Sequence, residues 1–464
     1  MSDNPLSDQA EPGMLDDPAA RFIVAACSPR NGHRSGTLDE AEMILGQDPQ
    51  VAGSSIYAAS ILGDETTVRG FLARDPSGAT AKGGPLGWDA LTYVCFSRYL
   101  RLDRTRSDAF VHTARALLDA GASSNTGWIE MIDHPNPRPV IESAIYGAAA
   151  IAQHSGLTRL LLERGADPND EETAYHVIET YDNSVLRILL ESGRFNKQSL
   201  AVALLRKCDW HDLNGLQLVL ENGADPNWMS GWGLTAFHQA LRRDNRLAMI
   251  ELLLDYGADP LQPSREGTSA ILIAARRGRA DALDLFEKRG VPIKLSGLDQ
   301  LIAACARDDK TTIRSLIAAG PQLKSELTER GGTLLAEFAG NGNAAGVRDL
   351  LDLGVAANAL YGEGDGYYGI ARESTALHVA AWRAQPDVVR ELIAQGADVD
   401  ARDGQDRTAL QLAVKACVDS WWTERRSPDS VRELLAAGAS TEGIELPTGY
   451  AEIDALLRKG QNTG

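Results

Sequence analysis

Two short stretches of the sequence combine residue types that could do chemistry. In residues 208–212 (CDWHD) a histidine lies between two aspartates, an arrangement that could tune it as a general base. Residues 364–369 (GDGYYG) have the glycine spacing of a dinucleotide-binding loop, and Glu363 and Asp365 add two carboxylates there. Each of these chemistries requires a particular structural setting.

Neither stretch has the setting that its chemistry requires. A dinucleotide loop follows a strand and opens a helix, whereas residues 364–369 fall inside an inserted turn. Two carboxylates also fall short of the ligand series of a calcium loop. Residues 208–212 lie where one helix should turn into the next, so we expect Asp212 or Asn214 to cap the second helix. We therefore predict no enzyme, no cofactor and no metal site, and the sequence has no G-x-S-x-G, H-E-x-x-H or Walker motif.

Charge and cysteine content restrict the compartment and the partners. The chain of 464 residues has 46 Lys and Arg against 64 Asp and Glu, a formal charge of -18. Nucleic acid and anionic membranes require a basic face, so we expect neither, and the acidic balance suits either solubility or a basic protein or peptide partner. The five scattered cysteines have no zinc-ligand spacing and suit a reducing compartment. With no apolar signal segment and no run of 18 apolar residues, a cytoplasmic location is predicted.

A recurring phrase predicts the elements that position these residues. Its clearest copy begins at Thr375 (TALHVAA) and ends at residues 396–398 (GAD), with other copies at 235–259 and 143–169. Within residues 388–393 (VVRELI) the apolar positions at i, i+1, i+4 and i+5 mark one face of a helix. Threonine caps the start of such a helix, and the glycine lets its end leave through a left-handed conformation.

This phrase resembles the ankyrin repeat, whose signature is T-P-L-H-x-A in a unit of about 33 residues. The resemblance implies an all-α solenoid of about twelve helix-turn-helix units with projecting turns, several of them degenerate. We expect a disordered acidic tail over residues 1–17, the array over 18–460 and a short tail over 461–464. Units over 18–230 are irregular and those over 231–460 more regular. The degenerate Ala- and Arg-rich units resemble bacterial ankyrin proteins.

Histidines occupy one shared position of the repeat. His378, His238 and His176 each stand three residues after the start of a unit. In the ankyrin family this histidine bonds to neighbouring backbone, so the resemblance implies a structural role. The unit that contains His176 is short and ends at Gly193 without the usual Ala-Asp.

Four insertions interrupt the repeat and map to its loops. They cover residues 98–106, 126–137, 361–369 and 419–426, and three prolines at 135, 137 and 139 stiffen the second. The aromatic residues near these turns could bind a partner or pack their own loops. Both readings stay open for the tryptophans, whereas the glycine-flanked tyrosines have little nearby apolar material and favour binding.

The first functional hypothesis is a non-enzymatic scaffold that binds a partner protein or peptide on the concave face and inserted turns. Its candidate contacts are Trp88, Arg98, Tyr99, Arg101, Trp128, Trp228, Trp232, Tyr361, Tyr367, Tyr368, Trp421 and Trp422. The alternative is an enzyme or small-ligand receptor with a pocket near the irregular units over residues 89–243. Its candidate pocket residues are Tyr146, His176, Trp210, His211 and Arg242.

Overall fold

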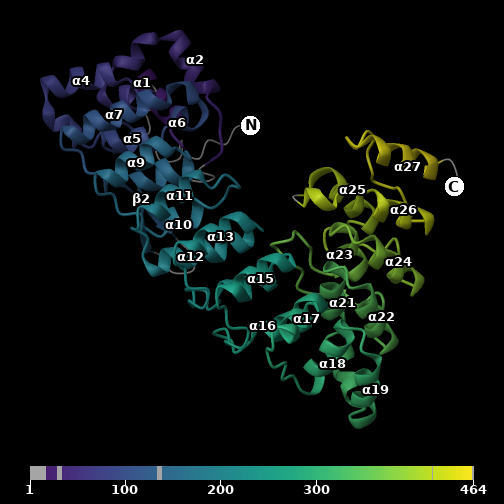
Figure 1. Ribbon diagram of the computed structural model, residues 1–464. Coiled ribbons are helices and arrows are strands. Elements are labelled where there is room, and N and C mark those ends of the chain that lie inside the picture. The colour runs from purple at the N-terminus through teal and green to yellow at the C-terminus, as the bar shows by residue number, and fades with distance from the viewer. Residues whose placement is uncertain (1–16, 29–33, 133–137, 421, 462–464) are drawn as a thin grey trace. The chain divides into compact units, whose positions relative to one another are not determined.

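The protein is an all-α solenoid of antiparallel helix pairs. The computed structural model describes residues 17–28, 34–132, 138–420 and 422–461. Twelve helix pairs follow one another along these residues (Figure 1). The chain divides into two compact units, Met1–Gln239 and Ala240–Gly464, which we describe separately.

The first unit contains six helix pairs and one β-hairpin. Its elements are α1 (Pro18–Ala26), α2 (Asp39–Gln47), α3 (Ile56–Leu62), α4 (Glu65–Arg74), α5 (Ala90–Cys95), α6 (Arg98–Leu102), α7 (Ser107–Asp119), β1 (Gly127–Ile132), β2 (Arg138–Ser143), α8 (Ala144–Tyr146), the π-helical turn η6 (Gly147–Ile151), α9 (Ser155–Glu163), α10 (Glu172–His176), α11 (Ser184–Glu191), α12 (Lys197–Asp209) and α13 (Leu213–Glu221).

The second unit contains the remaining pairs and a closing helix. After α14 (Ala236–Arg242), at the boundary, come α15 (Leu247–Asp255), α16 (Ala270–Arg276), α17 (Ala280–Lys288), α18 (Gly297–Ala306), α19 (Lys310–Ala319), α20 (Leu323–Glu329), α21 (Gly331–Gly340), α22 (Ala344–Asp352), β3 (Leu360–Tyr361), β4 (Ser374–Thr375), α23 (Ala376–Trp382), α24 (Pro386–Ala394), α25 (Ala409–Asp419), the short turn η7 (Thr423–Arg425), α26 (Asp429–Ala436) and α27 (Ala451–Gln461).

The pair α23 and α24 illustrates why this sequence forms a repeat. Thr375 and His378 form a capping box at the start of α23, and every residue of α23 is buried. Pro386 begins α24 at a position where no amide hydrogen bond is lost. The apolar face of α24 is buried between neighbouring helices, and Gly396 leaves the pair with a φ of 83°.

Three features of the array depart from the repeat and were not predicted. The second insertion continues into an antiparallel hairpin, in which β1 pairs with β2 from Gly127 opposite Ser143 to Ile132 opposite Arg138. The first insertion forms the short helix α6. An additional helix, α20, lies between α19 and α21. Short helical or strand segments satisfy the backbone of these long connections, which a repeat pattern alone does not reveal.

Candidate functional site

The shared repeat histidine is a structural residue in the second unit. The Nδ1 atom of His378 lies 3.1 Å from the backbone nitrogen and 2.8 Å from the hydroxyl of Thr375. Its Nε2 atom lies 2.9 and 3.0 Å from the carbonyl oxygens of Ala401 and Arg407 in the following turn. Burial lowers the pKa of His378, which therefore stays neutral and ties one repeat to the next.

His176 has a different setting at the same repeat position. Its Nε2 atom lies 3.2 Å from a carboxylate oxygen of Glu172, and its Nδ1 atom lies 3.1 Å from one of Glu179. Burial alone would lower the pKa of His176, but the hydrogen bonds to these two carboxylates outweigh it and raise the pKa to about 9. The imidazole is therefore a cation at neutral pH.

The shortness of this unit accounts for the difference. The carbonyls that hold His378 belong to the long connection between α24 and α25, residues 395–408. The corresponding connection between α11 and α12 comprises only residues 192–196, as the missing Ala-Asp indicated. The shorter turn leaves a hollow on the side of His176 that a full turn would cover.

Two adjoining cavities share His176. One of about 580 Å³ is lined by residues of α10, of the start of α12 and of the turn at 231–232. Its aromatic wall comprises Tyr175 and Trp232, whose ring centroids are 5.9 Å apart, and Trp232 is 55% exposed. The other, of about 530 Å³, is lined by Arg34, Ser35, Tyr146, Ala150, Ile151, His176 and Glu179. The structure thus brings together Tyr146 and His176, two of the predicted pocket residues, with ring centroids 5.7 Å apart.

Arg34 reaches this site from the first helix pair. Its guanidinium donates to the carbonyl oxygens of Ala150 at 3.1 Å, Glu179 at 2.9 Å and His176 at 3.2 Å. The carbonyls of Ala150 and His176 lie at the carboxyl ends of short helices, where backbone acceptors lack helical partners, and that of Glu179 lies in the turn after α10. A side chain from the start of the array therefore closes one wall of the cavity.

Carboxyl groups with raised pKa values lie beside the first cavity wall. Burial and the neighbouring carboxylates of Glu172 and Glu130 raise the pKa of Glu142 to about 9. Burial also raises the pKa of Asp170 to about 6, although hydrogen bonds from Ser143 and Thr173 oppose the shift. Within the described ranges, no group of three or more His, Cys, Asp or Glu side chains is arranged to hold a metal ion.

Most other aromatic and arginine candidates of the first unit are packed inside it. Trp88 and Trp128 are 4% and 5% exposed and stack with ring centroids 5.5 Å apart. Tyr99 is buried, and Arg98 donates to the carbonyl oxygen of Ala25 at 2.7 Å. Arg101 donates to backbone carbonyls of residues 35 and 36. Their burial favours loop packing for these tryptophans, whereas Trp228, half-buried, donates to Gln198 at 3.1 Å beside the larger cavity.

The cluster at 208–212 is a helix turn, and Asp212 caps α13 as predicted by accepting from the amide of Gly215 at 2.9 Å. Asp212 also pairs at 2.8 Å with Lys207, which is fully buried. His211 stands in the turn with a φ of 51°, and Trp210 lies 6.1 Å from the ring of Tyr181. Neither His211 nor Trp210 lines either cavity, and Arg242 belongs to the second unit.

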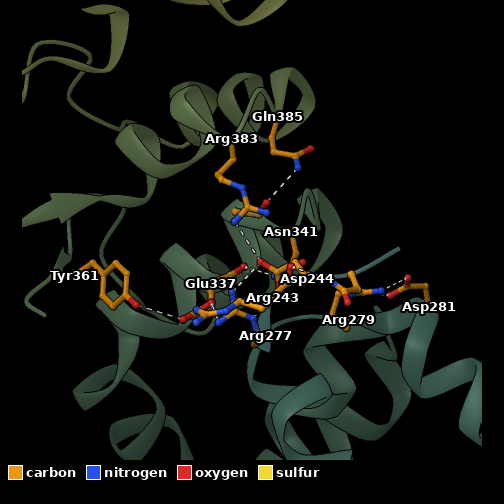
Figure 2. A network of polar contacts seen from close by, with 12 residues as sticks. Arg243, Asp244, Arg277, Arg279, Asp281, Glu337, Asn341, Tyr361, Arg383 and Gln385 are labelled. Atoms are coloured by element: carbon orange, nitrogen blue, oxygen red, sulfur yellow. Dashed lines mark hydrogen bonds and ion pairs between the residues drawn. The ribbon is translucent and has the colours of Figure 1, made fainter. Parts of the chain in front are cut away.

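The second unit carries a buried ionic network at the ends of its inner helices. Figure 2 shows Asp244 facing Arg277, at 2.6 Å, and Arg383, at 3.1 Å. Arg277 also pairs with Glu337 at 2.8 Å. Burial would raise the pKa of Asp244, but the adjacent guanidinium groups hold it far below its usual range. The network thus joins Glu337 of α21 to Asp244, Arg277 and Arg383, which follow α14, α16 and α23, although these residues are far apart in the sequence.

The two later insertions fill the space beside this network. Tyr368 is 2% exposed and packs with Trp382 and Trp422. The Arg383 guanidinium lies 3.8 Å from the centre of the Tyr368 ring, and that of Arg243 lies 3.7 Å from that of Tyr367. Tyr361, also buried, donates to Glu337 at 3.3 Å. This burial favours packing over partner contact for the tyrosines, and the candidate Trp421 lies outside the described residues.

Sequence reasoning missed several residues that build these sites. Arg34 lines one cavity of the first unit, Glu142 and Asp170 are its carboxyl groups with raised pKa values, and Asp244 and Arg383 anchor the second unit's network. Arg243, Arg277 and Arg383 share one repeat position, just after the inner helix. That recurrence was visible in the sequence and could have indicated the network.

Comparison with known families identifies the repeat. A family model described as ankyrin repeats in three copies matches residues 200–295 and 301–403. Residues 200–295 and 301–403 therefore contain ankyrin repeats, and stacked helix pairs continue on either side of them. Among the described residues, no helix has the length and apolar character needed to cross a membrane.

Similar proteins carry the same kind of repeat. Human ankyrin repeat and SOCS box protein 16 is 32% identical over 155 residues, which cover 33% of this chain and 32% of that protein. The chain therefore matches about a third of the length of that curated relative. Among solved structures, the ankyrin repeat domain of Bcl-3, a member of the IkappaB family, is 21% identical and covers 50% of this chain and 96% of its own, with a TM-score of 0.22. The human ASB11 ankyrin repeat domain is 21% identical and covers 52% of this chain and 98% of its own, with a TM-score of 0.22.

Proposed function

We propose that the chain is a non-enzymatic scaffold that binds a partner protein or peptide at the two cavities sharing His176. The observation that carries the proposal is the hollow left by the short connection at residues 192–196. Trp232, Tyr175 and the cationic His176 line this hollow, and aromatic and cationic side chains dominate protein interfaces. Of the other partner candidates in the first unit, Trp228 lies beside this hollow, because its indole N–H donates to Gln198 in the cavity wall.

Charge around the hollow supports a basic partner segment. Glu171 and Glu172 line the larger cavity, where they face His176 and Arg138 as local countercharges. The whole chain carries a formal charge of -18, which would steer a positively charged partner toward it. The exposed part of the Trp232 ring would then supply most of the affinity.

A small-ligand receptor or enzyme is the second candidate, because Tyr146 and His176 do line a cavity of about 530 Å³. A general base must be unprotonated at the working pH. The raised pKa of His176, about 9, leaves it protonated at neutral pH and so favours binding over catalysis. Five buried thiols, Cys27, Cys95, Cys208, Cys305 and Cys417, support a reducing, cytoplasmic compartment.

Trp232→Ala tests the binding proposal. The full chain is used to capture its partner from the native host, and the affinity of the purified partner is then measured by calorimetry. We expect Trp232→Ala to weaken binding by about 2 kcal/mol or more, as truncation of an interface tryptophan does. The melting temperature should stay unchanged, because the side chain is 55% exposed.

Tyr256→Ala is the matched control, since Tyr256 is 41% exposed on the second unit. This variant should bind like the wild type. Equal affinity of the Trp232→Ala and wild-type chains would contradict the assignment of the binding site. Turnover of a small substrate that disappears with His176→Gln would instead support the second candidate.

A further inference from the structure

Three arginines lie at the smaller cavity of the first unit without a carboxylate partner. Arg34 lines this cavity, and Arg101 and Arg104 belong to the first insertion, residues 98–106. Among the residues that the structure describes, none of the three guanidinium groups forms an ion pair. Residues 29–33, which precede Arg34 and are not described, contain no Asp or Glu.

Backbone contacts place two of these arginines on one stretch of the cavity wall. The Nε atom of Arg34 donates to the carbonyl oxygen of Ala150 at 3.1 Å. The Nη2 atom of Arg104 donates to the carbonyl oxygen of Ala152, two residues further along the chain, at 2.8 Å. Because Ala150 and Ile151 line the cavity, Arg104 lies at its edge, directly beside Arg34.

Arg101 reaches the same wall from α6. Its Nη2 atom donates to the carbonyl oxygens of the two residues that follow Arg34, at 3.0 and 3.1 Å. The first of these residues, Ser35, lines the cavity. The Nε atom of Arg101 is buried and has no hydrogen-bond partner among the described residues. Burial, followed by repulsion from Arg98, Arg34 and Arg104, lowers the pKa of Arg101, as expected for a guanidinium group among others.

The carboxylates closest to these arginines are held by other cations. Glu179 lines the cavity, but its Oε1 atom lies 3.1 Å from His176 and 2.9 Å from Arg206. Asp103 pairs with Arg106 at 2.9 Å. These ion pairs leave the charges of the three arginines at the cavity without a direct countercharge.

Two further carboxylates of the region, Asp108 and Glu40, also leave these arginines unpaired. Burial and then Arg104 lower the pKa of His154, whereas Asp108 opposes this shift, so both charges act on that ring. Asp108 forms no ion pair with Arg104 in the described part of the chain. Glu40 lies 3.9 Å from Arg21.

Three guanidinium groups at one cavity favour a ligand with more than two charged oxygens. Guanidinium groups bind carboxylate and phosphate oxygens through parallel N–H donors. A carboxylate has two such oxygens, whereas a phosphate group has at least three, which three arginines can share. The cavity of about 530 Å³ also has room for the group that carries the phosphate, against Tyr146 and Ile151.

We propose that the smaller cavity binds a phosphate group between Arg34, Arg101 and Arg104. The N–H donors of Arg101 and Arg104 that the backbone does not use contact the phosphate oxygens, and the cationic His176 in the cavity wall adds to the attraction. The phosphate is either free or carried by a side chain of a partner. This site goes beyond the function proposed above, because phosphate can bind there without the partner.

Calorimetric titration of the full chain at constant ionic strength and neutral pH tests the site. We expect saturable binding of inorganic phosphate, and binding of acetate that is weaker by about tenfold or more. Equal binding of acetate would overturn the assignment to phosphate.

A neutral peptide with one phosphoserine distinguishes the two sources of phosphate, with the unmodified peptide as its control. Phosphopeptide binding tighter than that of inorganic phosphate by about tenfold or more identifies a phosphorylated partner. Equal binding identifies free phosphate, and equal binding of the modified and unmodified peptides counts against the site.

Arg104→Ala should weaken phosphate binding by about tenfold or more. Its melting temperature should change little, because Arg104 is exposed and donates to a single backbone carbonyl. Arg74→Ala is the matched control, since Arg74 is also exposed and its Nε atom donates to the carbonyl oxygen of Gly70 at 3.1 Å. This control should bind phosphate like the wild type.

Two more variants separate this site from the proposed partner site. Trp232→Ala, which alters the larger cavity, should bind phosphate like the wild type even where it loses the partner. Arg104→Glu should abolish phosphate binding, because it places a carboxylate at the edge of the cavity. Absence of saturable phosphate binding by the wild type, or equal affinity of the wild type and Arg104→Ala, overturns the proposal.

Discussion

The inner helices of the two units end in contrasting environments. In the first unit a short connection at residues 192–196 leaves two cavities beside His176. In the second unit Tyr368 of the insertion at 361–369 and Trp422 of the insertion at 419–426 pack against Trp382 and the guanidinium group of Arg383 at the corresponding helix end. The shortened connection of the first unit therefore leaves an open cavity, whereas the insertions of the second unit fill the corresponding space.

The histidines repeat this contrast at the level of a single side chain. His378 is neutral and bonds to backbone carbonyls, whereas His176 is a cation held by two carboxylates. Both occupy the same repeat position, so the difference arises from the following turn. The same repeat position therefore holds a buried structural histidine in one unit and a histidine that lines a cavity in the other.

Loss of Asp244 should cause the largest loss of stability, because it disrupts the buried ionic network of the second unit. Asp244→Ala leaves Arg277 and Arg383 buried without this countercharge. Removing one partner of a buried ion pair costs about 3–5 kcal/mol of unfolding free energy. Urea denaturation followed by circular dichroism measures the change.

Asp284→Ala provides the matched control, because Asp284 pairs with Arg307 at 2.7 Å but is 64% exposed. An exposed ion pair contributes about 0–1 kcal/mol. Equal destabilisation by the two variants would mean that the buried network contributes nothing beyond a surface pair.

Tyr368→Ala should have the next largest effect and sharpen the contrast between packed and open aromatic residues. The sequence favoured partner binding for the glycine-flanked tyrosines, because they have little nearby apolar material. Because Tyr368 is 2% exposed and packs on Trp382 and Trp422, its truncation should cost about 3–5 kcal/mol. Thermal denaturation of this variant beside Trp232→Ala gives the comparison, and a Tyr368→Ala chain of wild-type stability would return the tyrosine to the candidate contacts.

The two histidines should give the smallest effects, with opposite dependence on pH. The stabilisation by His176 is complete below its unfolded pKa of about 6.5 and is lost as pH rises through about 9. The pKa of His378 is lowered, so its stabilisation is present above about 6.5 and is lost as pH falls. Each histidine, where it stabilises, should contribute about 1–3 kcal/mol.

Unfolding of His176→Gln and His378→Gln between about pH 5.5 and about pH 9.5 tests this opposition. The difference from the wild type should shrink with rising pH for His176→Gln and with falling pH for His378→Gln. If the loss of stability depended on pH in the same way for both variants, the two histidines would share one protonation state, and the contrast between them would be wrong.

Local rules were sufficient to predict the helix pairs. The start at Thr375, the apolar stripe of residues 388–393 and the exit at Gly396 each act within a few residues, so the structure follows them. The helix α20 and the strands β1 and β2 were missed, because they lie in segments without repeat pattern. Asp212 was predicted as a cap for the same reason that α23 was, since capping is a local interaction.

The candidate sites depend on contacts that no local pattern contains. Arg383 meets Asp244 across 139 positions of sequence, and Tyr368 meets Trp422 between two separate insertions. The composition of residues 361–369 suggested an exposed loop, because the apolar side chains that cover it come from α23, from α25 and from Trp422. Tyr146 and His176 were brought together because their units are neighbours, which the repeat spacing does encode.

The three carbonyl contacts of Arg34 have a consequence for how the chain folds during synthesis. Its acceptors follow it by 116, 142 and 145 residues, so the wall that it closes cannot form until the fifth helix pair has left the ribosome. Closing so long a segment is slow, because the loop entropy is lost before the contact is gained. Arg34 therefore completes one cavity wall late, after the helix pairs that follow it in the chain have been synthesised.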